Sequence, residues 1–202
     1  MNLPKTTNNV YKSDMVELFY QEFQKSPYIW SILVLILISL TYAALKIKNE
    51  PDDYLKKSTI FSFQNFNLRI PGWWTLTINE NNLIRFERTD TRYDWYAEFS
   101  SLETNQPSRE ILEKMIKKIS IEFDEVLEPE EIEIINGDSK IKIYRREGMS
   151  TISGIERAYF DLFVARNKFG KTLIGKSHSS ILNGCVEGPY FEEVINRLTS
   201  TN

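Results

Sequence analysis

An uncharged apolar stretch near the start of the chain contrasts with alternating apolar and polar positions further on. Residues 28–45 read YIWSILVLILISLTYAAL and contain no charged side chain. As a helix rising 1.5 Å per residue, this stretch would be about 27 Å long, close to the thickness of a bilayer's hydrocarbon core. Tyr28, Trp30 and Tyr42 lie at its edges, where amphipathic rings favour the membrane interface, and Lys46 marks its exit. The pattern predicts a transmembrane helix over residues 28–45.

Two other interpretations of this stretch are weaker. A core helix with no polar face is hard to enclose within a chain of 202 residues. A cleaved leader would carry Asp14, Glu17 and Glu22 in its first part, and Thr41-Tyr42-Ala43 is a poor cleavage site. An anchor is therefore favoured, which predicts a single-pass protein of the inner or plasma membrane if the source is bacterial.

The flanks of the anchor predict a tail and a tether. Residues 1–27 form an N-terminal tail, and residues 46–59 form a polar tether. Apolar positions in the tail have the spacing of a short amphipathic helix, namely Val16, Phe19, Tyr20 and Phe23. A frayed polar tail is an equal alternative. Lysines are slightly more frequent after the anchor, which favours a cytoplasmic domain, but the bias is small and leaves the side of the membrane undecided.

Alternation of apolar and polar positions predicts one α+β domain over residues 60–202. Runs with strand periodicity recur at residues 66–70, 74–78, 83–88, 95–99, 131–135, 140–145, 155–165 and 171–177. A helix is predicted after Pro107 with Ser108 as its N-cap, and a last helix is predicted to begin at Pro189. The order of strands, helix, strands and helix favours an antiparallel sheet with helices packed on it.

The first of these strands carries a family signature. Residues 66–74, FNLRIPGWW, resemble the opening strand-turn-strand of PsbP/Mog-type domains, and the resemblance extends over roughly residues 60–198. Here Pro71 and Gly72 are adjacent, without the family's spacer, so it is open whether Trp73 or Trp74 takes the family's buried position. Alternation favours Trp74, because it shares a side with the apolar residues that follow it.

The resemblance implies an α/β/α sandwich around an antiparallel sheet and a role in binding or assembly. The family includes photosystem II extrinsic subunits, a Ran-binding nuclear import factor and bacterial envelope proteins. Its common motifs are not catalytic. No residues of this sequence match the Ran-binding or manganese-related sites, so those specific functions are not carried over.

Composition argues against several classes of function. The chain has 25 basic and 28 acidic residues, a net charge of −3, so no basic surplus indicates nucleic-acid binding. One Cys excludes an intramolecular disulfide and a multi-cysteine zinc site, and one His makes a histidine-centred catalytic site improbable. We therefore predict no catalytic residue, no metal ligand and no cofactor.

One motif, in contrast, is typical of a nucleotide-binding site. Residues 170–177 read GKTLIGKS and match the phosphate-binding pattern G-x-x-x-x-G-K-[ST]. That chemistry needs a loop of free backbone N–H groups followed by a helix N-terminus. Leu173 and Ile174 favour a strand instead, and Asn183-Gly184 would interrupt a following helix. We interpret the segment as a β-strand and keep a nucleotide-dependent factor as the weaker alternative.

Three further features have a structural interpretation. The lone His178 is expected at the surface or in a turn, and Cys185 is expected to be a buried structural thiol. The acidic run from Glu122 to Glu133 lacks the spacing and the glycine of a calcium loop. It is expected to be a solvated surface or a docking face for a basic partner.

Aromatic residues provide the candidate contacts. Trp73, Tyr96 and Tyr159 fall opposite the main apolar sets of their strands, so they either pack under the helices, which is favoured, or form an exposed patch for a partner. Trp73 is the best single candidate for an exposed contact. The sequence thus predicts a membrane-anchored binding or assembly module that acts on a protein partner, and not an enzyme. A small-ligand or lipid carrier remains a further alternative.

Overall fold

The structure, a computed structural model, describes residues 20–21, 26–89, 94–125, 128–136 and 139–200. It divides into two units, Met1–Asp53 and Tyr54–Asn202. Most of the tail predicted over residues 1–27, including its amphipathic stripe, lies outside the described residues.

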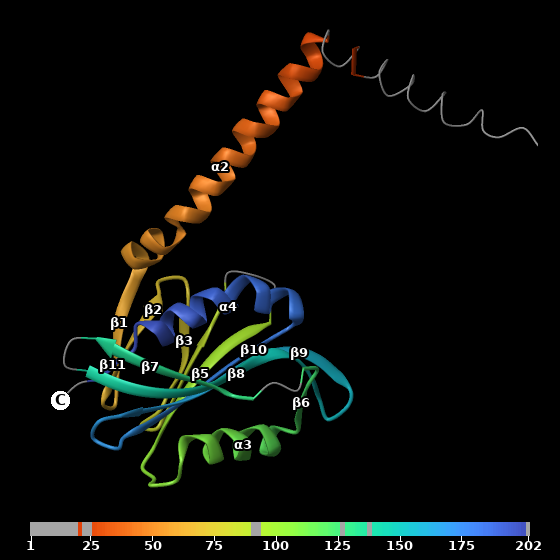
Figure 1. Ribbon diagram of the computed structural model, residues 1–202. Coiled ribbons are helices and arrows are strands. Elements are labelled where there is room, and N and C mark those ends of the chain that lie inside the picture. Colours follow the sequence, from red (N-terminus) through yellow and green to blue (C-terminus); the bar gives the residue numbers. More distant parts are fainter. Residues whose placement is uncertain (1–19, 22–25, 90–93, 126–127, 137–138, 201–202) are drawn as a thin grey trace, which may run out of the picture. The chain divides into compact units, whose positions relative to one another are not determined.

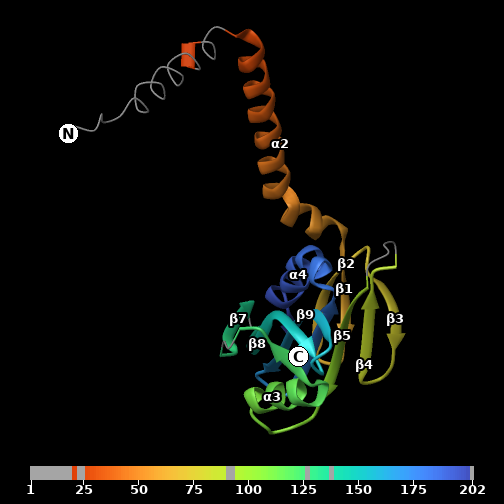
Figure 2. The ribbon, with the colours of Figure 1, turned by 90° about the vertical axis from the view of Figure 1, so that its right-hand side faces the viewer.

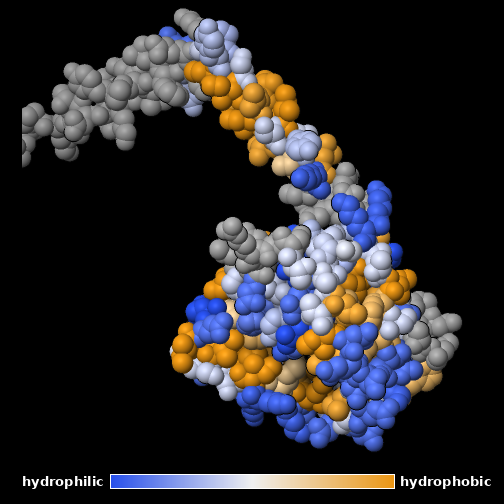
Figure 3. Space-filling model, turned by 180° about the vertical axis from the view of Figure 1, so that it is seen from behind, coloured by the Kyte–Doolittle hydropathy of each residue, from blue (hydrophilic) through white to orange (hydrophobic). Residues whose placement is uncertain are grey.

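The first unit is dominated by the helix α2 (Pro27–Lys57), whose last residues belong to the second unit. Its segment Pro27–Lys46 is long and apolar enough to cross a membrane, and none of that segment is buried in the structure. Apolar side chains accordingly dominate its surface (Figure 3). The hydroxyls of Ser31, Ser39 and Thr41 each donate to the carbonyl four residues earlier, so the helix itself satisfies them.

The segment predicted as a polar tether over residues 46–59 is helical over most of its length. The helix α2 continues to Lys57, and the first strand begins at Ser58. The polar residues after the apolar segment therefore extend the helix, because most of them are compatible with helical backbone, and their role as a tether stays a prediction.

The second unit contains an eight-stranded antiparallel sheet, which we call the large sheet (Figure 1). Its strands, in spatial order, are β3 (Thr75–Asn79), β4 (Leu83–Glu87), β5 (Trp95–Leu102), β10 (Thr172–Ser179), β9 (Glu156–Asn167), β8 (Ser139–Ile152) and β6 (Ile121–Phe123), with β7 (Glu130–Asn136) paired to β8. The long β8–β9 hairpin runs in register from Ile152↔Glu156 to Ile141↔Asn167.

A small sheet and two helices complete the domain. The small sheet consists of β1 (Ser58–Phe63), β2 (Phe66–Pro71) and β11 (Thr199–Ser200), with β2 in the middle. The helix α4 (Ile181–Asn196) and the small sheet pack on one face of the large sheet, and α3 (Ser108–Ile119) packs on the other (Figures 1 and 2). The fold is therefore α+β, with an antiparallel sheet between helices, as the sequence predicted.

Strand alternation explains the two cores. Along β9, Phe163 and Ala165 belong to the core under α4, whereas Leu162 and Val164 belong to the core under α3. Both sets are fully buried. On the neighbouring strand Gly175 leaves room for the Phe163 ring, since a Cβ atom there would lie 2.0 Å from that ring.

The helix ends differ from the sequence predictions. The N-cap of α3 is Pro107, and Ser108, which was predicted to be the N-cap, is the first residue of the helix. No side chain makes a capping hydrogen bond at this end. The helix α4 begins at Ile181, and Pro189, where it was predicted to begin, lies inside it. The prediction that Trp74 is the buried tryptophan is confirmed, because its side chain is part of the core under α4.

Candidate functional site: a polar groove beside α4

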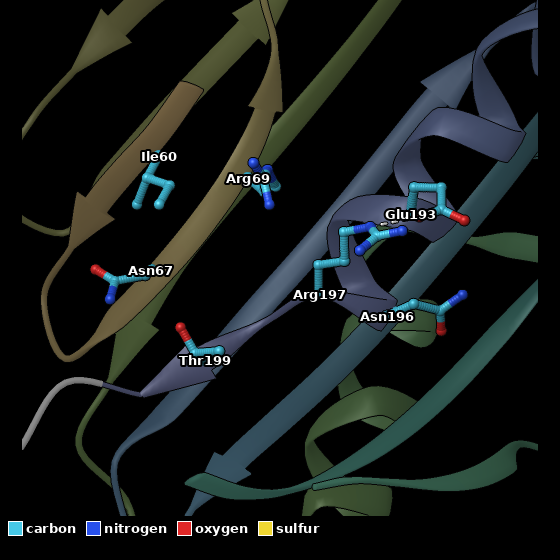
Figure 4. Close-up of a pocket in the computed structure, with 7 residues that line it drawn as sticks. All are labelled: Ile60, Asn67, Arg69, Glu193, Asn196, Arg197 and Thr199. Atoms are coloured by element: carbon cyan, nitrogen blue, oxygen red, sulfur yellow. Dashed lines mark hydrogen bonds and ion pairs between the residues drawn. The ribbon is translucent and has the colours of Figure 1, made fainter. Parts of the chain in front are cut away.

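A polar groove of about 450 Å³ lies in the second unit between the small sheet and the end of α4 (Figure 4). We call it the α4 groove. Its lining residues come from β1, β2, β11 and the last turn of α4, and they are Ile60, Asn67, Arg69, Glu193, Asn196, Arg197 and Thr199.

The alternation of β2 creates the sheet side of the groove. Phe66, Leu68 and Ile70 point into the core, so Asn67 and Arg69 point to the other side of the strand. The β1–β2 register places Ile60 opposite Arg69. Ile60 is 68% exposed, which leaves one apolar side chain at the edge of an otherwise polar groove.

The end of α4 provides the other side. The Arg197 Nε donates to Glu193 Oε2 at 2.8 Å, and Figure 4 shows the two side chains directed at one another. Arg197 occupies the C-cap position of α4. A cation there is favoured by the partial negative charge of the last helical carbonyls.

Contacts beneath Arg69 hold the groove in shape. The Arg69 Nε donates to Ser58 Oγ at 2.9 Å, and the Arg69 carbonyl accepts the Tyr54 hydroxyl at 2.5 Å. Tyr54 is only 1% exposed, and its ring stacks on that of Tyr190. Burial, with Glu193 adding to it, raises the pKa of the Tyr54 hydroxyl well above its usual range, so this side chain stays a neutral donor.

This set of side chains suits recognition better than catalysis. The groove offers two guanidinium groups, a carboxylate, two amides and a hydroxyl, beside the apolar Ile60. Its one carboxylate already pairs with Arg197. Arginine next to an apolar contact is a frequent combination at protein interfaces.

The three predicted contact residues do not come together. Trp73 is half-buried, with its ring edge-on to Tyr190 at 4.9 Å between centroids. Tyr96 lies beside His178 on the α3 face of the large sheet, with ring centroids 5.1 Å apart. Tyr159 lies on the α4 face, where its hydroxyl donates to Glu147 at 2.8 Å.

The residues proposed to lie at a membrane interface are all on α2. Tyr28, Trp30 and Tyr42 have exposed rings, and Lys46 ends the apolar segment. Their role at a membrane interface stays a prediction.

The phosphate-loop motif is a strand, as preferred from the sequence. Thr172–Ser179 form β10 in the interior of the large sheet, paired with β5 on one side and β9 on the other. The backbone N–H groups needed to cradle a phosphate are therefore engaged in the sheet. This contradicts the alternative of a nucleotide site at residues 170–177.

The expectation for His178 is wrong. It lies within β10 and is only 9% exposed, between the rings of Tyr96 and Phe160. Among the described residues, neither of its ring nitrogens has a hydrogen-bond partner. Burial lowers the pKa of His178, so the imidazole is neutral near pH 7. The side chain of Cys185 lies outside the described residues.

Several carboxylates of the acidic run form ion pairs with basic residues outside it. Asp124 pairs with Arg157, Glu128 with Arg109, and Glu133 with Lys140. Among the described residues, no group of three His, Cys, Asp or Glu side chains could hold a metal ion. Pairing of this kind leaves less unbalanced charge for a basic partner than the sequence run suggested.

Buried ionic groups under α4 were missed by sequence reasoning. Arg145 donates twice to the fully buried Asp161, at 3.0 and 2.8 Å. Glu187 of α4 is 2% exposed, pairs with Arg88 and accepts the Trp74 indole N–H at 2.9 Å. A charged residue inside an apolar strand run, as Asp161 is, was the available signal.

Comparison with known proteins found no family model and no curated protein that matches the chain. Solved structures that resemble it include the PA94 protein of Pseudomonas aeruginosa, described as of unknown function, with 9% identity over 72% of this chain and 98% of that chain and a TM-score of 0.44. Another is the Ran-binding protein Mog1p of Saccharomyces cerevisiae, with 7% identity over 72% and 96% of the two chains and a TM-score of 0.45. Likeness at this level carries no argument about function.

Proposed function

We propose that this chain is a single-pass membrane protein whose C-terminal domain binds a protein partner close to the bilayer. The observation that carries the proposal is the segment Pro27–Lys46, an apolar helix of 20 residues with none of its length buried. An apolar helix of that length is stable in a bilayer and costly to expose to water.

The chain length between the anchor and the α4 groove limits how far the partner can be from the membrane. Ile60 follows Lys46 by 14 residues, which span at most about 50 Å even when fully extended. The groove is thus tethered near the lipid surface in any arrangement of the two units. Membrane attachment also raises the effective concentration of the domain toward a membrane-bound partner.

The chemistry of the α4 groove favours a protein segment as the ligand. Arg69 and Arg197 can each donate to a carboxylate or a backbone carbonyl, and Ile60 can cover an apolar side chain. We further propose that the domain is of the PsbP/Mog type, on the strength of residues 66–74 and the order of its strands and helices. For that family a binding role would be expected.

Photo-crosslinking in native membranes tests the proposal. A photoreactive residue at Ile60 is expected to capture one partner band, and Arg197→Glu in the same chain is expected to remove it. The matched control is Ile155, which is 88% exposed and lies in the β8–β9 connection. The same bands from both positions, or bands at Ile60 that are indifferent to Arg197→Glu, would contradict the groove assignment.

The anchor itself is tested separately. Alkaline carbonate should leave the full chain in the membrane pellet, and release into the supernatant would refute the anchor. An impermeant protease on intact cells, with an epitope after Asn202, then reports which side of the membrane the domain faces.

The two tryptophans test the predicted contact at Trp73. Trp73→Ala is expected to weaken partner capture with the domain still folded, whereas Trp74→Ala should unfold it, because only Trp74 is core. Unfolding in both would show that Trp73 is structural.

A further inference from the structure

A second cavity lies on the α3 face of the large sheet and is lined mainly by cationic side chains. It has a volume of about 460 Å³, within the range of small-ligand sites. We call it the α3 pocket. It is lined by Ser108, Glu131, Lys140, Lys142, Tyr144, Arg166, Asn167 and Lys168. Four of these side chains are cationic and one is a carboxylate, in a chain whose net charge is −3.

Strand geometry gathers the cations on one side of the large sheet. Lys140, Lys142 and Tyr144 alternate along β8 and therefore share a face, and Arg166 of β9 is opposite Lys142. Lys140 pairs with Glu133 at 2.9 Å, whereas the Lys142 Nζ is 4.0 Å from Glu131. Both lysines are more than half exposed, so their ammonium groups can turn toward a ligand without a large desolvation cost.

The start of α3 adds backbone donors to the same pocket. Ser108 is the first helical residue, and the cap residue Pro107 offers no side-chain acceptor to the first-turn N–H groups. The Arg166 guanidinium donates to the carbonyls of Thr104 and Gln106, which fixes the loop before α3 against the sheet. A helix N-terminus with a partial positive charge therefore lies beside the lysines.

Asn167 organises the turn between β9 and β10 at the edge of the pocket. It is only 4% exposed, and its Oδ1 accepts the N–H groups of Phe169 and Lys171, each at 3.0 Å. Its side chain lies on the opposite face of β9 from Arg166, because it alternates with Arg166 and is paired with the core residue Ile141. Asn167 therefore shapes the rim of the pocket and is not one of the groups directed at a ligand.

We propose that the α3 pocket binds a phosphate-bearing small molecule, such as a phosphomonoester or a diphosphate. Lys142, Lys140 and Arg166 neutralise the phosphate charge, and the first-turn amides of α3 donate to its oxygens. The pocket is distinct from residues 170–177, whose resemblance to a phosphate loop is only one of sequence. It is also independent of the α4 groove, so either proposal can fail without the other.

Titration with pyrophosphate tests this site. The full chain in nanodiscs of neutral lipid is titrated at constant ionic strength, and binding is followed by calorimetry. We expect Lys142→Gln to weaken binding about tenfold, because one charge-assisted hydrogen bond is lost. Glu131→Gln is expected to strengthen binding, because it removes a like charge. Lys117→Gln on the last turn of α3 removes one positive charge elsewhere and should change nothing.

The titration results distinguish a phosphate site in the α3 pocket from its absence. Absence of pyrophosphate binding to the folded chain, or equal affinity for all variants, would overturn the proposal. Opposite effects of Lys142→Gln and Glu131→Gln would support it even if both variants lose some stability. Repeating the titration in nanodiscs that contain phosphatidic acid distinguishes the source of the phosphate. Weaker pyrophosphate binding there identifies a lipid headgroup as the competing ligand, and unchanged binding identifies a soluble one.

Discussion

Ion pairs on the two faces of the large sheet differ in their exposure to solvent. On the α4 face, Arg145 and Asp161 are buried together within the core. On the α3 face, Glu98 lies between Arg85 and Lys176 in a row that solvent can reach. Because α3 covers only part of its face, water screens the second set but not the first.

This difference predicts which charge substitutions destabilise the domain. A buried ion pair contributes little over an apolar pair, but removal of one partner leaves a charge that neither water nor protein satisfies. The α4 face is therefore expected to be intolerant of single charge changes, and the α3 face tolerant of them. The same contrast explains why both candidate binding sites lie where side chains remain accessible.

The largest expected effect comes from Asp161→Ala. It leaves the Arg145 guanidinium, whose side chain is 6% exposed, without its main partner. We expect a loss of about 3–5 kcal/mol in the free energy of unfolding, measured by urea denaturation of the full chain in detergent. Glu98→Gln on the other face should cost about 1 kcal/mol. Equal losses for the two variants would remove the distinction between the faces.

A smaller effect is expected where α4 contacts the sheet. A Cβ atom on Gly184 would lie 2.4 Å from the Tyr159 ring, whereas one on Gly188 would lie 3.7 Å from it. Gly184→Ala is therefore expected to cost about 2 kcal/mol, because α4 must move away from the sheet. Gly188→Ala should be neutral or slightly stabilising, since alanine favours the helix. Thermal unfolding compares the pair, and a neutral Gly184→Ala would show that α4 adjusts freely.

The smallest effect is a pH dependence on the α3 face. Burial lowers the pKa of His178 below its usual value of 6.5, and Lys176 acts in the same direction, against the opposing charges of Asp94, Glu156 and Glu98. The unfolded state then binds the proton more tightly, so this contribution to stability is complete above about pH 6.5 and declines as the pH falls below it. The decline is at most about 1.4 kcal/mol per pH unit.

His178→Phe isolates that contribution. The variant keeps an aromatic ring between Tyr96 and Phe160 but cannot titrate. Unfolding curves from pH 7.5 to 5 should be flatter for the variant than for the parent chain. Parallel curves would mean that His178 is solvated in the folded state.

Alternation was sufficient to predict the antiparallel strands and the burial of Trp74, and Pro107 was sufficient to mark the helix that follows it, because each depends on neighbours within one strand or helix. The start of α4 could not be predicted in this way. Asn183-Gly184 reads locally as a break, yet Gly184 lies inside the helix where the Tyr159 ring requires a residue without a side chain. Tertiary contact overrides the local preference there.

The candidate sites were less predictable than the fold. The α4 groove joins Arg69 to Arg197, and the α3 pocket joins Ser108 to Lys142 and Arg166, across separations that no sequence pattern connects. The burial of His178 likewise depends on rings from two other strands. Such sites follow from strand order and register, which alternation alone does not determine.

The burial of Tyr54 determines how the domain can be separated from its anchor. A soluble fragment that starts at residue 60, the boundary predicted from the sequence, would lose the hydroxyl that caps the Arg69 carbonyl and the ring that covers Tyr190. It would also lose part of β1, an uncharged edge strand of sequence STIFSF, and expose the backbone of β2 to self-pairing. Fragments that begin shortly before Tyr54 should therefore remain monodisperse, whereas shorter ones should aggregate.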